Sequence, residues 1–350
     1  MILKHYKPKK PGMAMAVVLG IMIAVSVICL IVFNIRTKNL LDSSADAGTS
    51  QSHYIFVADS SDKFNTLVYE AMKKKLADQD AYLEFMGQDM ETSYSTFDLM
   101  KMAVYAKPDG IFVVGDGTDE MTKQINTAVS ENIPVICVSG DCYGSLRQSY
   151  VGVTYYEFGQ RMAQQFISDT DKDADSGERK DVLILTSPAE RNTNQNLICS
   201  GIRDYIQKNL LSTRYTIRTR EVGTGGMFSD VEIINQLFES GDLPDILICL
   251  DEQNTTHVCQ AVVDTNHVGD VSIYGSFTND TILSAIRKHV ISGVLTVSPE
   301  DIGARAADSM TEYVKDGFVT EYSTIDIQTV TADNADDFTV SDSQSDTEDS

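Results

Sequence analysis

The residues best suited to chemistry in this chain are polar side chains that follow hydrophobic segments. Carboxylates stand beside hydroxyls and amides at several of these places, as in Asp59 to Asp62 and Asp251 to Gln253. Such groups can hydrogen-bond the hydroxyls of a small polar ligand. Asp, Ser and Asn also cap helices and form turns, so residue type alone does not separate a binding role from a structural one.

Motifs for catalysis and for metal binding are missing from the sequence. GxSxG, HExxH and GxxxxGK[ST] patterns do not occur, and His257 and His267 have no Cys or carboxylate at ligand spacing. The neighbouring carboxylates Asp251 and Glu252 point apart on either a helix or a strand. We therefore expect a protein that is not an enzyme and that holds neither a metal nor a cofactor.

The charge of the chain argues against a nucleic-acid partner. The formal net charge is -23, and Lys and Arg do not cluster outside the N-terminal tail. A nucleic-acid binder must neutralise phosphates with clustered basic side chains. Part of the acidity lies in residues 331–350, where acids stand among Ser and Thr, so we expect a disordered acidic tail there.

Residues 13–33 form an uncharged run that is long enough, as a helix, to cross a bilayer. The run is longer than the apolar part of a signal peptide, so we expect an uncleaved anchor. Four lysines precede it, which predicts a cytoplasmic tail over residues 1–12 and an extracytoplasmic remainder. Residues 34–52 are small and polar and are typical of a flexible linker.

Strand and helix patterns alternate through the rest of the chain. Between the predicted strands lie amphipathic stretches, for example one with Met121, Ile125 and Val129 on one face. Apolar strands separated by helices predict α/β lobes with doubly wound parallel sheets. The predicted strands are His53–Ala58, Tyr82–Met86, Gly110–Gly115, Pro134–Val138, Val182–Thr186, Tyr215–Glu221, Ile246–Leu250, Val271–Gly275 and Gly293–Val297.

Five cysteines lie outside the predicted anchor, and no zinc-type spacing occurs among them. Cys199, Cys249 and Cys259 have the surroundings of small buried hydrophobic residues. Cys137 and Cys142 are close enough in sequence to form a disulfide across a loop, and the sequence leaves that question open.

Several segments, in order and spacing, resemble the ribose- and galactose-binding group of type-1 periplasmic binding proteins, a family related to the ligand-binding domain of lac-repressor-type regulators. The resemblance extends from about residue 53 to 330. It rests on Lys107–Ile111, Asn132–Ile136, Tyr150–Gly152, Tyr156–Gly159, Pro244–Asp245, Asp251–Glu252, Tyr274–Gly275 and Pro299–Gly303.

The resemblance implies two lobes that face each other and close on a ligand by hinge motion. It predicts lobe 1 from residues 53–153 and 271–297, and lobe 2 from residues 154–270 and 298–330. Ligands of open α/β sheets bind where loops follow the carboxyl ends of strands. The expected ligand-binding residues are Asp59, Ser60, Asp62, Phe64, Glu91, Ser139, Asp141, Tyr155, Arg191, Asn192, Asp251, Gln253 and Phe277.

The chain departs from this family at positions that bind sugar hydroxyls. By spacing, apolar residues replace the expected polar ones at Val153, Ile198, Leu250, Phe277 and Val297. This leaves open a less hydroxylated ligand, a displaced site, or a cleft that has lost its ligand.

The resemblance implies capture of a sugar-like small molecule and its presentation to a membrane partner. An ABC permease or a sensor kinase would fit that role, and the uncleaved anchor favours sensing slightly. The alternative is a ligand-free interaction or scaffold domain, in which Phe277, Leu250 and Val297 would plug the cleft.

Overall fold

The computed structural model describes residues 51–90, 92, 94–170, 179–187, 193–223 and 227–338. The helices and strands described below lie between Ser52 and Asp337. The expected tail, anchor and most of the linker lie outside the described residues, as do Glu91, Arg191 and Asn192. Among the helices that are described, none is both long and apolar enough to cross a membrane.

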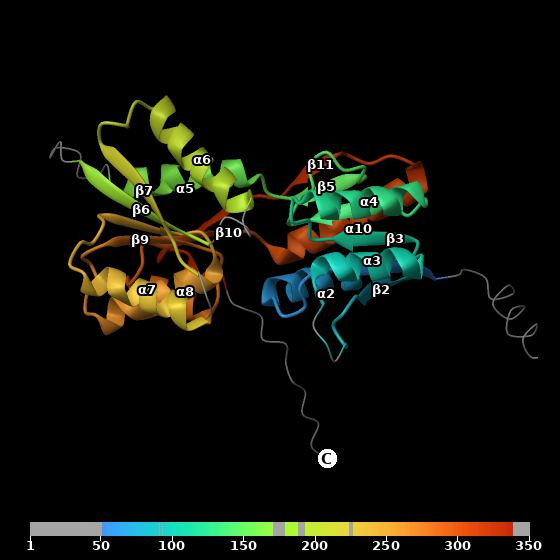
Figure 1. The fold of residues 1–350 in the computed structure, drawn as a ribbon, viewed down its shortest axis with the longest axis horizontal. Coiled ribbons are helices and arrows are strands. Elements are labelled where there is room, and N and C mark those ends of the chain that lie inside the picture. The colour runs from blue at the N-terminus through green and yellow to red at the C-terminus, as the bar shows by residue number, and fades with distance from the viewer. Residues whose placement is uncertain are drawn as a thin grey trace, which may run out of the picture. The chain divides into compact units, whose positions relative to one another are not determined.

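The described strands form two six-stranded sheets, one in each lobe (Figure 1). In lobe 1 the order is β11-β5-β4-β3-β1-β2, with β1 Ser52–Val57, β2 Ala81–Phe85, β3 Gly110–Val113, β4 Val135–Val138, β5 Ser149–Gly152 and β11 Tyr322–Thr324. In lobe 2 it is β12-β10-β9-β8-β6-β7, with β6 Lys180–Thr186, β7 Tyr215–Glu221, β8 Ile246–Cys249, β9 Ser272–Ser276, β10 Gly293–Thr296 and β12 Gln328–Val330.

Both sheets contain the doubly wound order in which the second strand of the lobe lies outside the first. The lobes are thus built as β2-β1-β3-β4-β5 and β7-β6-β8-β9-β10. Strand β12 runs antiparallel to β10, whereas β11 runs parallel to β5. In such sheets the strand order reverses between β1 and β3 and between β6 and β8, and the loops that leave there form a crevice.

Helices cover both faces of each sheet, which explains why the strands are apolar on both sides. In β1, Tyr54 and Phe56 pack with α2 (Lys63–Ala77) and α10 (Pro299–Asp316). The alternate residues Ile55 and Val57 pack with α3 (Thr96–Ala106) and α4 (Asp119–Ser130). The fold class expected from the sequence is therefore confirmed for this lobe.

Lobe 2 repeats the arrangement. Val182 and Ile184 of β6 belong to the cluster that includes α5 (Tyr155–Thr170) and α6 (Thr193–Lys208). Leu183 and Leu185 face α7 (Met227–Glu239), α8 (Glu252–Asp264) and α9 (Asp280–Arg287). In both lobes, successive residues of a strand point to opposite faces of the sheet and pack against different helices.

All nine predicted strands are present, with ends that differ by no more than two residues. Strands β5, β11 and β12 were not predicted as strands. Strands β11 and β12 have three residues each, which is too short for a periodic pattern to identify. Strand β5 reads SYVG and lacks the apolar run of β3 and β4, which are equally short.

The expected division of the C-terminal half between the lobes is wrong. Residues 271–297 belong to lobe 2, because β9 pairs with β8 and β10 pairs with β9. Helix α10 belongs to lobe 1, where its Ile302 and Met310 join the cluster of α2. The chain crosses between lobes after β5, after β10 and between β11 and β12.

The ordered domain also extends past the expected end at residue 330. A short 3₁₀ helix, η3 (Ala335–Asp337), follows β12, and Ala335 is fully buried. The Arg287 guanidinium donates from Nε to Asp336 at 2.8 Å. These contacts attach the segment to α9, so residues 331–338 are part of lobe 2.

All five described cysteines are free and buried. Cys137 and Cys142 hydrogen-bond each other, and burial raises the pKa of the Cys137 thiol. In the structure this pair is therefore two thiols and not a disulfide.

Candidate functional site

A cavity of about 840 Å³ lies between the two lobes. Its walls come from the loops after β1, β3 and β4 in lobe 1 and after β6 and β8 in lobe 2, and the first two interlobe crossings also contribute. This volume is in the range of small-molecule sites, which are commonly found where the strand order of α/β sheets reverses.

Two of the helices that begin at the cavity, α2 and α8, have a carboxylate at the N-cap. Asp62 accepts a hydrogen bond from the Phe64 N–H at 2.9 Å, and Asp251 accepts one from the Asn254 N–H at 2.7 Å. These carboxylates satisfy unpaired N–H groups and compensate the positive ends of the α2 and α8 dipoles. Desolvation by surrounding protein atoms raises the pKa of Asp62.

The structure brings together seven of the expected ligand-binding residues. Asp62, Phe64, Ser139 and Tyr155 line the cavity together with Asp251, Gln253 and Phe277. Asp62 and Phe277, 215 positions apart in the sequence, thus share one surface, because the two sheets direct their loops to the same space. Contact between these residues and a ligand stays a prediction.

Three other expected residues lie away from the cavity walls. Asp59 closes a turn, accepting hydrogen bonds from the Ser61 N–H at 2.9 Å and the Ser61 hydroxyl at 2.7 Å. Ser60, in the same turn, and Asp141 are not among the lining residues.

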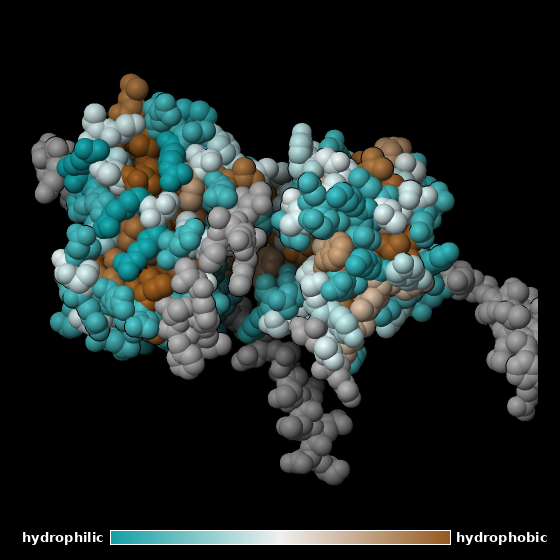
Figure 2. Space-filling model, in the orientation of Figure 1, coloured by the Kyte–Doolittle hydropathy of each residue, from teal (hydrophilic) through white to brown (hydrophobic). Residues whose placement is uncertain are grey.

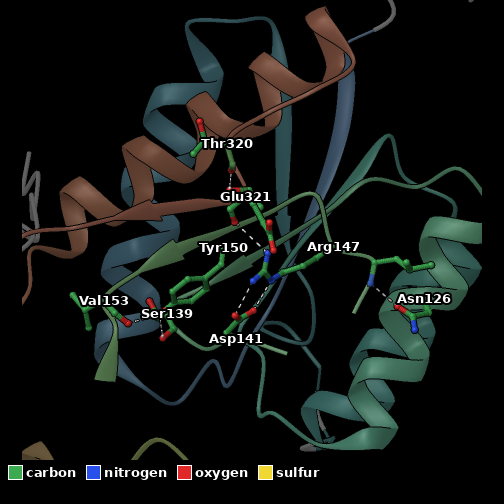
Figure 3. Close-up of polar contacts among 10 residues, drawn as sticks. Asn126, Ser139, Asp141, Arg147, Tyr150, Val153, Thr320 and Glu321 are labelled. Atoms are coloured by element: carbon green, nitrogen blue, oxygen red, sulfur yellow. Dashed lines mark hydrogen bonds and ion pairs between the residues drawn. The ribbon is translucent and has the colours of Figure 1, made fainter. Parts of the chain in front are cut away.

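Asp141 is held by Arg147, as Figure 3 shows. The guanidinium donates from Nε to Oδ1 at 2.5 Å and from Nη2 to Oδ2 at 2.8 Å. Its Nη1 reaches the Glu321 carbonyl at 3.2 Å, and its face covers the Tyr322 ring at 4.8 Å. Hydrogen bonds and charge attraction from Asp141 raise the pKa of Arg147 despite its burial.

The ion pair supports the loop that carries Ser139 to the cavity. Ser139 has a left-handed backbone with φ of 60°, and its carbonyl accepts hydrogen bonds from the hydroxyls of Tyr150 at 3.2 Å and Tyr155 at 2.8 Å. Burial raises the pKa of Tyr155 to about 12. Tyr155 therefore joins the start of α5 to lobe 1 and stays a neutral donor at physiological pH.

An aromatic contact spans the two lobes beside the cavity. The rings of Phe64 in α2 and Phe277 after β9 have centroids 5.6 Å apart, and Phe277 lies 6.2 Å from Phe158 in α5. Phe277 has φ of 64°, a conformation that bulky side chains rarely adopt. Its N–H donates to the Leu295 carbonyl at 2.7 Å.

The apolar positions identified in the sequence separate into two groups. Val153, Phe277 and Val297 line the cavity. Ile198 and Leu250 are 3% exposed and belong to the hydrophobic cluster of the lobes. Only the first group therefore changes the chemistry of the cavity.

Sequence reasoning missed several polar residues of the cavity. Ser187 directly follows β6. The others stand in the first two turns of helices, where a capping role conceals them, and they are Asn65, Asp230, Glu252, Asn254, Thr256 and His257. Asn65 and Asn254 could have been recognised from the sequence, because Asn is uncommon on the buried face of a helix and both residues are buried.

The described residues contain no group of three His, Cys, Asp or Glu side chains arranged to hold a metal ion. The cavity itself is lined by hydrogen-bonding side chains together with apolar ones.

Comparisons with known proteins agree with this geometry. A family model described as "Periplasmic binding protein domain" matches residues 54–317. None of the curated proteins compared with the chain matches it.

Solved structures share the fold at low sequence identity. GanP, a glucose-galactose binding protein from Geobacillus stearothermophilus, is 20% identical, with a TM-score of 0.72 over 82% of this chain and 99% of its own. A chain of the XylFII-LytSN complex is 23% identical, with a TM-score of 0.69 over 81% of this chain and 99% of its own. AraP, an arabinose binding protein from Geobacillus stearothermophilus, is 18% identical, with a TM-score of 0.68 over 83% of this chain and 99% of its own.

Proposed function

Because the chain belongs to the periplasmic binding protein domain family, we propose that it captures a sugar-like small molecule outside the cytoplasm while anchored by residues 13–33. The observation that supports capture is the cavity itself, about 840 Å³ in volume and lined by both lobes. A ligand in that position contacts both lobes at once, so its binding free energy favours the closed arrangement.

The cavity also favours a binder over a ligand-free scaffold. Of the three residues expected to plug a degenerate cleft, Leu250 packs in the hydrophobic cluster, and Phe277 and Val297 line an open volume. A plugged cleft would leave no such volume. The similar solved structures that carry a functional description are sugar-binding proteins, which supports binding rather than catalysis.

The closed form would be recognised by a membrane partner. An ABC permease and a sensor kinase remain the two candidates, and a permanent anchor favours the sensor because the protein acts where it is tethered. The similarity to XylFII, which was solved in complex with LytSN, supports the idea that a lobed domain of this fold can dock to a second protein.

A thermal-shift screen of the full chain in mild detergent tests capture. The chain has no Trp, but its five described cysteines are buried and free, so a thiol-reactive fluorophore reports unfolding. The panel would hold pentoses, hexoses, polyols and nucleosides. We expect one class to raise the melting temperature by several degrees, because a ligand that binds only the folded state stabilises it.

A cooperative melting transition that no member of the panel shifts would contradict capture of a sugar-like molecule. It would leave the scaffold as the better function. A matched control is an anionic probe such as ribose 5-phosphate, which we expect to bind poorly because carboxylates outnumber Lys63 among the described residues that line the cavity.

A further inference from the structure

The floor of the cavity is apolar. Val153 and Val297 stand where the chain leaves β5 and β10 to cross between lobes, and both line the cavity together with Val114, Phe277 and Ile302. We call these five residues the apolar floor. They belong to, or pack against, one hydrophobic cluster that extends through both lobes. Figure 2 shows hydrophobic residues at the junction of the lobes, with hydrophilic residues beside them.

Phe277 is held in this floor against its backbone preference. A left-handed φ of 64° suits Asn or Gly better than Phe. The ring nevertheless stays in place, because it contacts Phe64 and Phe158 at centroid distances of 5.6 and 6.2 Å. The packing at the cavity thus outweighs the backbone preference of Phe277 and keeps its ring available as an apolar surface for a ligand.

The walls above the floor are polar. Asn65 and Ser139 line the cavity from lobe 1, and Asn194, Asn254 and His257 line it from lobe 2. The Ser139 hydroxyl and the His257 Nδ1 are buried without a hydrogen-bond partner in the structure. A buried polar group without a partner destabilises the structure, because it has lost its hydration without a replacement hydrogen bond.

Two tyrosine hydroxyls near the first crossing already donate hydrogen bonds to backbone carbonyls. Tyr155 donates to the Ser139 carbonyl at 2.8 Å, and Tyr150 donates to the Val153 carbonyl at 2.8 Å. A ligand hydroxyl directed at Val153, Phe277 and Val297 would therefore lose its water and gain no hydrogen bond from their side chains.

We propose that the ligand is an uncharged, ring-shaped polyol with one deoxygenated end, such as a deoxy sugar or a deoxynucleoside, whose methyl group lies on the apolar floor. This inference rests on the proposed capture function and specifies its ligand class. The remaining hydroxyls face Asn65, Asn254 and the other polar residues of the walls, and the negative charge of the lining carboxylates disfavours an anionic end.

Matched pairs of probes test the proposal by isothermal titration calorimetry on the full chain in detergent. The pairs are D-galactose and D-fucose, L-mannose and L-rhamnose, and adenosine and 5′-deoxyadenosine, in which the second member replaces a hydroxymethyl by a methyl group. We expect the deoxy member of the pair that fits to bind roughly 10- to 100-fold more tightly.

A hydroxylated parent that binds as tightly as its deoxy partner overturns this inference and leaves the proposed function standing. Absence of heat from every probe at millimolar concentration, with a folded protein, overturns both.

Phe277→Asn tests the floor directly, because Asn accepts the left-handed backbone and adds a hydrogen-bonding amide. We expect the preference for the deoxy probe to fall about tenfold. Val297→Asn should act in the same direction from the second crossing. The control, Val263→Asn, lies at a half-exposed position of α8 outside the lining residues and should leave the preference unchanged.

Circular dichroism melting confirms that each variant is folded before titration. An unchanged preference in both folded floor variants would overturn the placement of the deoxygenated end.

Discussion

At the scale of single residues, the main lesson is that a polar residue in a cleft loop need not face the ligand. Asp141 follows β4 as a ligand-binding residue would, yet its two carboxylate oxygens are occupied by Arg147. Arg147 stands six residues later, and only the loop conformation brings the two together. Asp141 therefore acts through the position of Ser139.

We expect Arg147→Met to lower the free energy of unfolding by about 3 kcal/mol, because it leaves the Asp141 carboxylate partly buried without a counter-charge. Urea denaturation followed by circular dichroism measures the change. The double variant Arg147→Met with Asp141→Asn should recover part of the loss, since no charge is then left unpaired. Equal stability of the single variant and the wild type would contradict a structural role for the pair.

At the scale of elements, lobe 2 depends on a close approach of α5 and α6. A Cβ added at Gly201 would lie 2.1 Å from the Tyr156 carbonyl oxygen, and one added at Gly159 would lie 2.1 Å from that of Ile198. Only glycine allows the helix backbones to approach so closely. The approach places the start of α5, with Tyr155, at the interlobe crossing.

In Gly201→Ala the helices must separate, which we expect to lower the free energy of unfolding by about 1 to 3 kcal/mol. The higher helix propensity of Ala offsets about 1 kcal/mol of this cost, and we expect a net loss of stability. Urea denaturation of the variant measures the net effect. The control, Ser200→Ala, changes an exposed neighbour in α6 and should stay within about 0.5 kcal/mol of wild type. A stabilised Gly201→Ala variant would mean that α5 and α6 are further apart.

At the scale of the whole molecule, the two lobes depend on three crossings, and two of them supply residues to the cavity floor. Val153 and Val297 line the cavity where the first two crossings begin. Their side chains belong to a hydrophobic cluster shared by both lobes. In the proposal made above, these positions both connect the lobes and contact the deoxygenated end of the ligand.

The proposed anchor is tested at this scale as well. We expect the full chain to sediment with membranes after extraction with alkaline carbonate, because residues 13–33 carry no charge. Val25→Arg together with Ile28→Arg should move the protein to the soluble fraction, since charges near the middle of a membrane helix are costly. Release of the unaltered chain by carbonate would contradict an integral anchor.

The sequence by itself determined the fold class and most of the strands. Apolar periodicity depends on near neighbours, so His53–Ala58 and Ile246–Leu250 could be identified as buried strands without knowledge of their partners. The loops that follow such strands were identifiable for the same reason, and seven of the expected residues line the cavity.

Only the tertiary structure decided which lobe each C-terminal element joins and which polar residues face the cavity. Strands β9 and β10 and helix α10 have similar local patterns whichever sheet they join, and hydrogen bonds to β8 and packing on α2 make the choice. The positions of Leu250 in a hydrophobic cluster and of His257 at the cavity likewise depend on side chains far away in the sequence. Long-range contacts of this kind leave no periodic trace in a single sequence, because they depend on how the whole chain packs.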